Sequence, residues 1–403
     1  MQLAKTSESS ATAEPYCGTE VLFGEVVKDV KESEREPLEA GLDRFIALEH
    51  MEPRNLHLKE WGSLYEEDTS FTKRFRKGQV LFAKRRAYQR KVAVAEFDGI
   101  CSSDILTFEP RDETLLPELL PFIVESNAFF DHALDTSSGS LSPRTRWNQL
   151  RDFAFVMPEK DSQKDIANSL WAADATEQRY LNVARKITTL INVMTREFLT
   201  SGWDQEACSE LFSVPPKNGL SPRANADKRG FPTLSLGAVR NGVITPEGNT
   251  KYAVITDDEL KRFRLKRDDL LVVRGNGNRL LCGKCAIVRE VPHDCFYPDL
   301  LIRITFDPEK LLPEFACVQW NTPSVHRRLL KRAKSTNGIW KINGKDVKQH
   351  KMFAPSKNAQ IDFLEELKGP TAALLASEYA AAKARQLRDS IVNEVLVPQG
   401  GGA

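Results

Sequence analysis

The chain has 403 residues, more than one compact core usually organises, so we expect two or three domains. Hydrophobic residues make up 41% of it and charged residues 28%, as in ordinary globular proteins, and no apolar run approaches the about 18 residues of a membrane helix. The formal net charge of +1 neither indicates nor excludes a nucleic-acid partner, because the local field decides such binding.

The N-terminal stretch, MQLAKTSESSATAEPYCGTE, is polar and acidic. It lacks the apolar segment of a signal peptide, and we expect residues 1–18 to form a disordered acidic extension. Seven cysteines lie scattered along the chain, which favours reduced thiols in the cytoplasm over a disulfide framework.

A strongly basic segment follows. Residues 71–91 hold nine Lys or Arg and no acidic residue. The runs QVLFA, KVAVAEF and ILTF are rich in β-branched and aromatic residues and predict strands around the basic loop KRRAYQRK. Taken alone, this loop is explained equally well as a solvated surface and as a surface for phosphate.

After a helical segment at LLPE and a small-residue loop, DTSSGSLSPR, the sequence predicts one long helix. From Ile166 to Phe198 apolar residues recur at alternating spacings of four and three, a heptad stripe with Glu177 as its one clear exception. About 40 residues of helix make a rod of roughly 60 Å. The alternative is an amphipathic helix that lies on its own domain.

The second half of the chain repeats the first. LLPE recurs at 115 and 311, Asp104 matches Asp299 at an offset of 195, and Gln163 matches Gln360 at an offset of 197. Upstream, KGQVLFAKRRAYQRKVAVA parallels RDDLLVVRGNGNRLLCGKCAIV. A repeat of about 195 residues is too long for a solenoid unit and indicates two homologous domains in tandem.

The repeat also predicts a second long helix, from Gln360 to Val397. Because proline interrupts helices, we expect this helix to be broken early, at Gly369-Pro370. Its later part is rich in alanine, which allows close approach of another helix.

We therefore predict an α+β fold of two tandem homologous domains, joined by two long helices that form an antiparallel coiled coil. The halves would be related by a pseudo-two-fold axis, which is also the symmetry of inverted half-sites in duplex DNA. The predicted segments are the acidic extension at 1–18, the first domain at 19–158, the central helix at 159–203, the second domain at 204–357, and the distal helix and tail at 358–403.

Motifs for catalysis or metal binding are weak. Cys282, Cys285 and Cys295 are residue types that suit zinc, but their spacing is irregular, and buried free cysteines are the favoured alternative. Five residues separate Gly277 from Gly283 where a phosphate loop has four, and Cys285 stands where Ser or Thr is needed. We find no methyltransferase, dinucleotide-binding or nuclease motif, so the sequence predicts binding and not catalysis.

The chain resembles the specificity subunits of type I restriction-modification enzymes over essentially its whole length. The resemblance is carried by RFIALEHMEPRNL and KGQVLFAKRRAYQRKVAVAEFDGICSSDILTFEP in the first copy, and by DDLLVVRGNGNRLLCGKCAIV, CFYPDLLIRI and STNGIWKI in the second. The family usually opens each long helix with a Glu-Gln pair, whereas Ser162 and Ala359 stand here in place of the Glu.

The resemblance implies two target recognition domains, each reading one half of a split DNA sequence. It also implies a non-catalytic chain without a cofactor, bound to double-stranded DNA and to two methyltransferase subunits that use S-adenosylmethionine. Such a complex methylates DNA in a system of phage defence in the cytoplasm, with no membrane partner. The sequence leaves open whether restriction subunits join it and what the DNA target is.

The candidate DNA-binding residues form strips at matching places in the repeat. Phosphate and base contacts are expected from Lys and Arg, bidentate base contacts from Asn and Arg, and packing on a sugar or base methyl from Tyr88. The first copy contributes Lys84, Arg85, Arg86, Tyr88, Arg90, Lys91, Ser137, Ser138, Arg144 and Arg146, and the second Arg274, Asn276, Asn278, Arg279, Lys334, Thr336, Asn337 and Lys341. Sequence alone does not separate contacts to bases from contacts to phosphates within this set.

Two other classes of protein are the alternatives. In a protein-interaction scaffold the basic strips would be solvated faces without DNA sequence preference. In a stand-alone nuclease or methyltransferase the isolated chain would be active with Mg²⁺ or S-adenosylmethionine.

Overall fold

The computed structural model describes residues 18–139, 142–240, 242–336 and 338–396. The predicted acidic extension lies outside the described residues except for Gly18, which begins the first strand. The chain divides into two compact units: unit 1 comprises Met1–Leu181 with Tyr379–Ala403, and unit 2 comprises Asn182–Glu378. Within the described residues, no helix is both long and apolar enough to cross a membrane.

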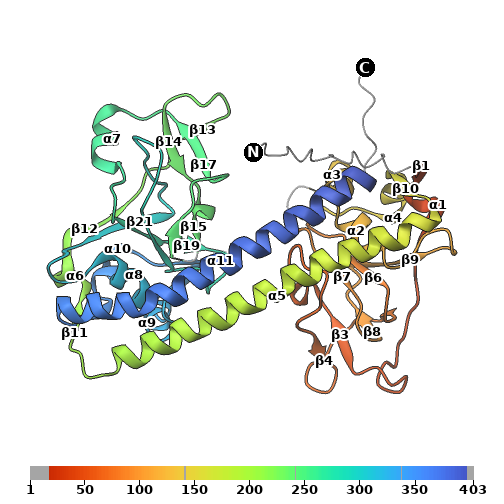
Figure 1. The fold of residues 1–403 in the computed structure, drawn as a ribbon, viewed down its shortest axis with the longest axis horizontal. Coiled ribbons are helices and arrows are strands. Elements are labelled where there is room, and N and C mark those ends of the chain that lie inside the picture. Colours follow the sequence, from red (N-terminus) through yellow and green to blue (C-terminus); the bar gives the residue numbers. More distant parts are fainter. Residues whose placement is uncertain (1–17, 140–141, 241, 337, 397–403) are drawn as a thin grey trace, which may run out of the picture. The chain divides into compact units, whose positions relative to one another are not determined.

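Unit 1 is built around two small sheets and a two-stranded ribbon (Figure 1). The strand orders are β2-β9-β6-β7, β4-β3-β8-β5 and β1-β10. The strands are β1 (Gly18–Leu22), β2 (Val27–Asp29), β3 (Arg44–Ile46), β4 (Gly62–Ser63), β5 (Lys73–Phe75), β6 (Val80–Ala83), β7 (Val92–Val94), β8 (Gly99–Cys101), β9 (Ile105–Pro110) and β10 (Ala154–Pro158). The helices are α1 (Phe23–Val26), η1 (Leu48–His50), η2 (Ala87–Gln89), α2 (Leu120–Glu125), α3 (Asn127–Asp135), α4 (Trp147–Leu150) and the start of α5 (Lys160–Leu199).

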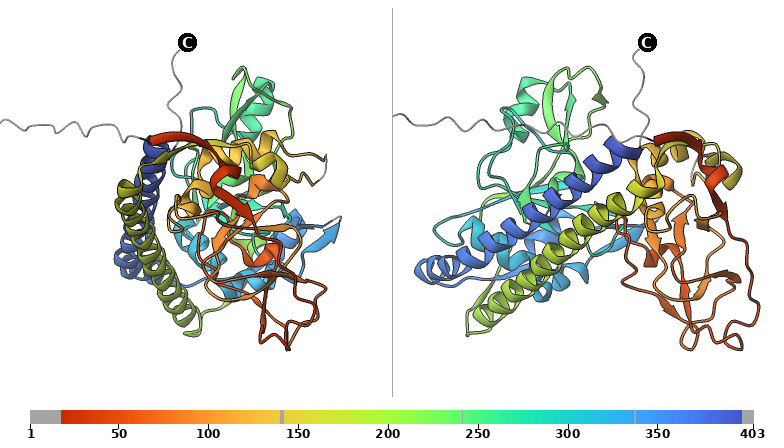
Figure 2. Two further views of the ribbon diagram at one scale, coloured as in Figure 1. Left: turned by 90° about the vertical axis from the view of Figure 1, so that its right-hand side faces the viewer. Right: turned by 45° about the vertical axis from the view of Figure 1, so that its right-hand side comes forward.

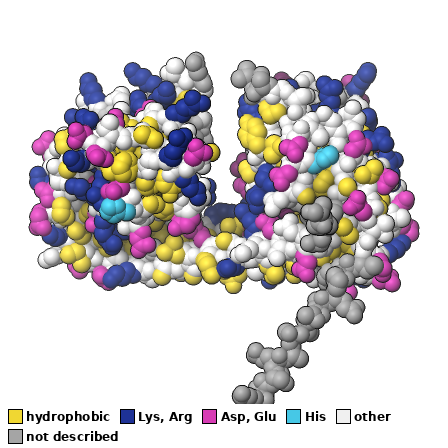
Figure 3. Space-filling model, turned by 90° about the horizontal axis from the view of Figure 1, so that it is seen from above, with side chains coloured by type: hydrophobic (Ala, Val, Ile, Leu, Met, Phe, Trp, Pro, Cys, Tyr) yellow, Lys and Arg dark blue, Asp and Glu magenta, His cyan; other side chains and the backbone are white. Residues whose placement is uncertain are grey.

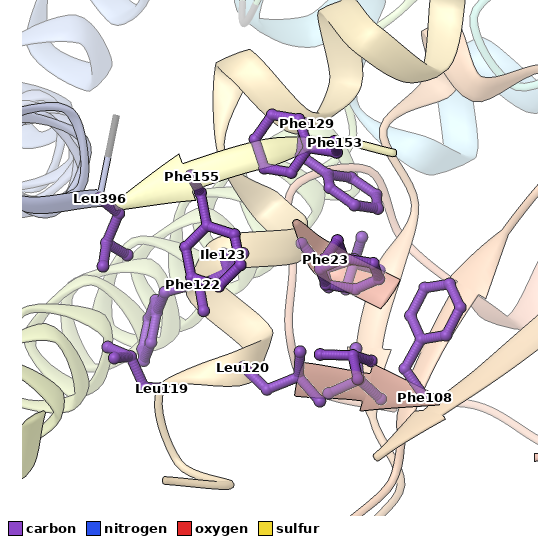
Figure 4. Close-up of a cluster of buried hydrophobic side chains, with 14 of the residues drawn as sticks. Phe23, Phe108, Leu119, Leu120, Phe122, Ile123, Phe129, Phe153, Phe155 and Leu396 are labelled. Carbon is purple, nitrogen blue, oxygen red and sulfur yellow. The ribbon is translucent and has the colours of Figure 1, made fainter. Parts of the chain in front are cut away.

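The core of unit 1 is aromatic. Phe23 and Phe108 meet edge to face, and Phe129 and Phe153 do the same, with centroids 5.4 and 5.1 Å apart. The close-up in Figure 4 shows these rings in one cluster with Phe155, beside which lies Leu396 from the last turn of the C-terminal helix. The two long helices therefore share the core of the domain that the chain's first 158 residues build.

Unit 2 has the same kind of elements around a longer sheet, ordered β12-β21-β18-β20-β16-β15. Three smaller sheets are β13-β17-β14, β19-β23-β22 and β11-β24. The strands are β11 (Gln205–Ala207), β12 (Phe212–Asn218), β13 (Ala224–Asn225), β14 (Phe231–Leu234), β15 (Val239–Arg240), β16 (Val243–Ile244), β17 (Thr250–Ala253), β18 (Leu270–Val273), β19 (Gly275–Asn276), β20 (Cys285–Ile287), β21 (Leu301–Phe306), β22 (Lys334–Thr336), β23 (Ile339–Lys341) and β24 (Lys351–Phe353). The helices are the end of α5, then α6 (Cys208–Leu211), η3 (Leu236–Ala238), α7 (Asp257–Phe263), α8 (Pro313–Asn321), α9 (Pro323–Leu330), α10 (Gly344–Lys348) and the start of α11 (Lys357–Leu396).

The predicted duplication is confirmed by pairing and register. In unit 1, β6 pairs antiparallel with β7 on one side and β9 on the other, and in unit 2 β18 pairs in the same way with β20 and β21. The two long helices, α5 and α11, each contain 40 residues and begin 197 positions apart, at Lys160 and Lys357. The α+β class with two repeated domains and two long helices is therefore confirmed.

Each unit contains an antiparallel pair of half-helices, visible in Figure 1 and in both views of Figure 2. In unit 1, Arg388 of α11 donates to Asp174 of α5, and Arg385, one turn earlier on α11, donates to Glu177, one turn later on α5. In unit 2, Phe198 stacks on Phe363 with centroids 4.2 Å apart. The exceptional Glu177 of the heptad stripe is thus buried because cations from the partner helix neutralise it.

The predicted break at Gly369-Pro370 is wrong, because α11 runs continuously through Pro370. Proline removes the hydrogen bond to the carbonyl four residues earlier, at Glu366, and this carbonyl belongs to an exposed residue that water reaches. Phe363 and Leu367, in the turns just before the proline, are buried in the core of unit 2 and hold the helix there. Tertiary packing therefore overrides a local cost of about 3 kcal/mol.

The matched glutamines fasten the start of each long helix. Gln163 accepts from Leu116 N at 2.7 Å and donates to the Thr114 carbonyl at 2.8 Å. Gln360 makes the same pair of bonds in unit 2, with Leu312 N and the Lys310 carbonyl. One buried amide satisfies a donor in the Leu-Leu-Pro-Glu element and the carbonyl of the residue just before it, so the same residue type serves both copies.

Candidate nucleic-acid interface

The candidate residues of unit 2 meet on one small sheet. β18 continues through Arg274 into β19, which pairs with β23, and β23 pairs with β22 in a hairpin. Gly275 lies opposite Lys341, and Lys341 lies opposite Lys334. Strips that are about 60 residues apart in the sequence therefore form one surface. The candidate Asn337 lies outside the described residues.

Three cations of this sheet are directed to solvent. Lys334 and Lys341 are exposed, and so is Arg279, whose guanidinium lies 4.6 Å from the centre of the Trp340 ring. Within the described residues none of the three forms an ion pair with a carboxylate. Stacking on the indole ring orders the Arg279 side chain and leaves the N–H donors at the edge of its guanidinium free to bind a ligand.

Arg274 differs from these three. Its Nη1 donates to the Asp299 carbonyl at 3.1 Å and lies 3.7 Å from the Asp299 carboxylate, so its charge is partly neutralised within the unit. Asn276 and Asn278 build the loop: Asn276 Oδ1 accepts from Asn278 N at 2.8 Å, and Asn278 Oδ1 accepts from Leu280 N at 2.9 Å. These two side chains act first as turn formers, and Thr336 stands exposed on β22.

Unit 1 repeats this arrangement with other side chains. Arg144 forms backbone β-bridges with Arg85 on one side and Ser138 on the other. In the same way, Lys341 pairs with Gly275 and with Lys334 in unit 2. The backbone contact from Thr145 N to the Lys84 carbonyl, 3.1 Å, matches that from Ile342 N to the Arg274 carbonyl, 2.9 Å. The two strips predicted separately in the first copy are therefore one surface as well.

Ser142 and Asp104 order the arginines of this surface. Ser142 Oγ accepts from Arg85 Nε at 2.8 Å and from Arg86 Nε at 3.2 Å, while Asp104 accepts from Arg144 Nε at 3.0 Å. Burial alone would raise the pKa of Asp104, but the hydrogen bond and charge of Arg144 prevail and lower it. Asp104 is thus ionised at neutral pH and offsets part of the positive charge.

Tyr88 and Arg146 are exposed beside these groups, whereas Ser137 is half-buried and donates to the Leu134 carbonyl at 2.9 Å. Arg86 and Arg90, at φ 57° and 53°, flank the short helix η2 that presents Tyr88. Left-handed backbone on both sides gives this loop a defined shape.

Two cations of the predicted strip are engaged inside unit 1, and Lys84 is half-buried. Arg90 Nη2 donates to the Glu125 carbonyl at 3.0 Å and lies over Phe130, and Lys91 Nζ donates to the Leu48 carbonyl at 2.6 Å. Burial lowers the pKa of Lys84 and of Lys91. The surface that faces solvent is therefore carried by the other basic residues.

The three cysteines of residue types that suit zinc do not converge. Cys282 and Cys285 belong to one buried cluster with Cys317, and Cys295 belongs to another. Cys285 Sγ and Cys317 Sγ lie 3.7 Å apart, and burial raises the pKa of Cys285. Among the described residues, no group of three or more His, Cys, Asp or Glu is placed to hold a metal ion.

Sequence reasoning missed Trp340 and Ser142, which do not bear charge but orient the arginines. Trp340 stands in the motif STNGIWKI, and its place next to a predicted loop was a usable signal. Ser142 had none, because its role arises only when the 137–146 segment lies against Arg85 and Arg86. On the face of each unit that Figure 3 presents, basic, acidic and hydrophobic side chains are interspersed.

Comparison with known proteins supports the resemblance. No family model matches the chain. It is 30% identical over 152 residues to the type I restriction enzyme EcoKI specificity subunit of Escherichia coli K12, covering 38% of this chain and 32% of that protein. It is 26% identical over 189 residues to the EcoDI specificity subunit of Escherichia coli, covering 45% of this chain and 42% of that protein. The chain thus spans less than half the length of the curated relatives it matches.

Among solved structures, the chain is similar to the S subunit of a type I restriction-modification system from M. genitalium, with a TM-score of 0.47, 12% identity and 99% coverage of both chains. It is also similar to the HsdS subunit of Thermoanaerobacter tengcongensis, with a TM-score of 0.38, 16% identity and coverage of 96% of this chain and 99% of that one. The predicted resemblance to type I specificity subunits is confirmed by the curated relatives.

Proposed function

We propose that this chain is the non-catalytic DNA-recognition subunit of a type I restriction-modification complex, in which each unit reads one half of a bipartite target. The observation that carries the proposal is the paired surface. The same backbone arrangement occurs in both units, yet its side chains are Arg85, Arg86 and Tyr88 in one and Asn276, Asn278 and Arg279 in the other. A duplicated frame with unlike donors is what two readers of unlike half-sites require.

The exposed cations and the ordered arginines are proposed to have different roles in DNA binding. Lys334 and Lys341 in unit 2, and Arg146 in unit 1, are exposed cations suited to phosphates, which position the duplex. Arg279 and Arg86 are held through one side of the guanidinium, by Trp340 and Ser142, and present the rest to base edges. Arg bidentate to guanine O6 and N7 is the commonest specific contact of this kind.

The paired helices are the proposed docking surface for methyltransferase subunits, which bring S-adenosylmethionine. In unit 1, the groove between α5 and α11 is lined by Ala172, Ala173 and Ala380, with Tyr379 and Leu387 exposed along it. An exposed apolar strip on a helix pair is suited to a protein partner. The proposal also includes binding of restriction subunits to the complex and its location in the cytoplasm.

The test is to express the chain with its methyltransferase partner and to map methylated bases in the host genome. A split motif with a fixed spacer is expected, and its halves should exchange independently when 19–158 or 204–357 is replaced by the same segment of a relative. A complex with no sequence preference in competition binding at physiological salt would instead indicate a protein-interaction scaffold. Methylation or cleavage by the isolated chain would indicate an enzyme.

A further inference from the structure

Unit 2 exposes aliphatic side chains among the polar residues of its candidate DNA-binding surface, which β19, β22, β23 and the loop at Arg279 form. Leu280 is 67% exposed, Leu281 49%, Ile339 41% and Leu300 40%. Leu280 and Leu281 directly follow Arg279 in the loop, and Ile339 directly precedes Trp340, on which Arg279 stacks. The loop and the hairpin thus bring apolar groups together with one ordered arginine.

The backbone of Gly275 places two of these groups on one side of the sheet. A Cβ built on Gly275 would lie 3.7 Å from Leu300 Cδ2, 3.8 Å from Ile339 Cγ2 and 3.5 Å from Lys341 Cγ. These side chains cover β19 from the face to which residue 275 would project. The apolar groups therefore lie among the cations of the surface and not apart from them.

The positive charges around these apolar groups indicate the kind of partner that the surface binds. Lys334, Lys341 and Arg279 surround the apolar groups, and within the described part of the chain none of them pairs with a carboxylate. Lysine is depleted in the buried centres of protein–protein interfaces, whereas cations around an apolar contact suit a duplex with its phosphates. The surface is thus complementary to DNA.

The major groove offers one apolar feature, the C5-methyl group of thymine. The matching loop of unit 1, residues 84–91, exposes Tyr88, and its one aliphatic side chain, Ala87, is buried. We infer that Leu280, Leu281 and Ile339 contact thymine methyl groups in the half-site that unit 2 binds. This inference rests on the proposed function and adds a substrate requirement: at least one A·T pair in that half-site.

The test replaces each thymine of the mapped target by uracil, one at a time, in a duplex bound by the complex of the full chain with its methyltransferase. Uracil lacks only the methyl group, so each contacted position should weaken binding about two- to fourfold. The slope of log affinity against log salt should not change, because no phosphate contact is lost.

Leu280→Ala and Ile339→Ala should abolish the difference between thymine and uracil at their positions. The matched control is Val254→Ala, another aliphatic residue of unit 2 that is 68% exposed but lies on the β13-β17-β14 side. This control should keep the full difference.

Three results would overturn the inference: a unit 2 half-site made of G·C pairs alone, equal binding of thymine and uracil duplexes, or a Leu280→Ala chain that keeps its thymine preference but no longer binds the methyltransferase. The last result would assign the surface to a protein partner. Failure of the proposed function looks different, since the complex would then show no preference for any duplex.

Discussion

Arg388 is the clearest case in which one residue decides local structure. It is 2% exposed and contacts Glu125, Asp174 and Glu177, all buried in unit 1. His57 adds a further partner, since its Nε2 lies 2.7 Å from Asp174 Oδ2. The cluster joins the long helices to the rest of unit 1, whereas in unit 2 the two helices also meet through the apolar stack of Phe198 on Phe363.

We predict that Arg388→Met destabilises unit 1 by about 3–5 kcal/mol, because Glu125 loses its cation while Asp174 and Glu177 keep only His57 and Arg385. Urea unfolding, with hydrogen exchange of residues 160–181 as the local readout, measures the loss. Arg179→Met, on the exposed face of α5, should change stability by less than about 0.5 kcal/mol. Equal effects of the two variants would show that the buried cluster contributes nothing.

At the scale of elements, α11 shows how packing outweighs propensity. Pro370 and Gly369 are the two worst helix formers, yet the helix continues through both. Since nothing in the described contacts requires a ring at position 370, the proline costs stability without a compensating bond.

We therefore predict that Pro370→Ala stabilises unit 2 by about 1–3 kcal/mol. Gly369→Ala, at the neighbouring open position where a Cβ meets no atom within 4 Å, should add about 1 kcal/mol. Thermal unfolding of the three chains checks the order of stability. A lower melting temperature for Pro370→Ala would mean that the complex or the fold uses a bend there.

The β22–β23 hairpin carries the electrostatic prediction. Lys334 and Lys341 lie opposite each other and are exposed, so each neutralises about one phosphate if the duplex lies on this sheet. The double variant Lys334→Ala/Lys341→Ala should weaken all DNA sequences alike. It should also reduce the slope of log affinity against log salt by about 1.8.

Lys266→Ala is the matched control for the hairpin, since Lys266 is exposed at the opposite end of β18. Fluorescence anisotropy over a series of salt concentrations gives both slopes. A double variant with an unchanged slope would place the phosphates elsewhere on unit 2.

At the scale of the whole molecule, the two units contain histidines whose pKa values shift in opposite directions. In unit 1, the hydrogen bond to Asp174 raises the pKa of His57, and burial raises the pKa of Glu125 to about 7 despite the charge of Arg388. In unit 2, burial lowers the pKa of His326 to about 4 and that of His350 to about 3. The first pair binds protons more tightly when folded, and the second pair binds them less tightly.

We predict that lowering the pH from about 7.5 to 5.5 stabilises unit 1 and destabilises unit 2. A raised pKa contributes stability that is present at low pH and lost as the pH rises through it. A histidine with a lowered pKa contributes stability above about 6.5 that is lost as the pH falls, by about 1.36 kcal/mol per pH unit for each group. Burial also raises the pKa of Asp269 and Glu378, which opposes the trend in unit 2, but from ordinary values well below this range.

Hydrogen exchange of α2 and α9, corrected for the pH dependence of the intrinsic rate, compares the units in one sample. Glu125→Gln should flatten the response of unit 1, and His350→Asn that of unit 2. Parallel responses of the two units would contradict the assignment of these four groups.

The sequence by itself determined the duplication, the strands around each reading loop, and the long helices. These features depend on local periodicity and on matching landmarks such as Gln163 and Gln360, whose bonds reach a nearby turn of the same copy. It also determined which residue types stand at the reading loops, because the repeat aligns the two loops without any knowledge of their contacts.

Only the tertiary structure decided which of these residues are open to a ligand. Arg90 and Lys91 read in the sequence like Arg86, but carbonyls of Glu125 and Leu48 engage them, whereas Trp340 and Ser142 order arginines that face solvent. It also decided that Glu177 is buried and that α11 passes through Pro370. The physical reason is common to all of these cases. The free-energy cost of a charge or a missing hydrogen bond depends on the groups that surround it, and those groups come from distant parts of the chain.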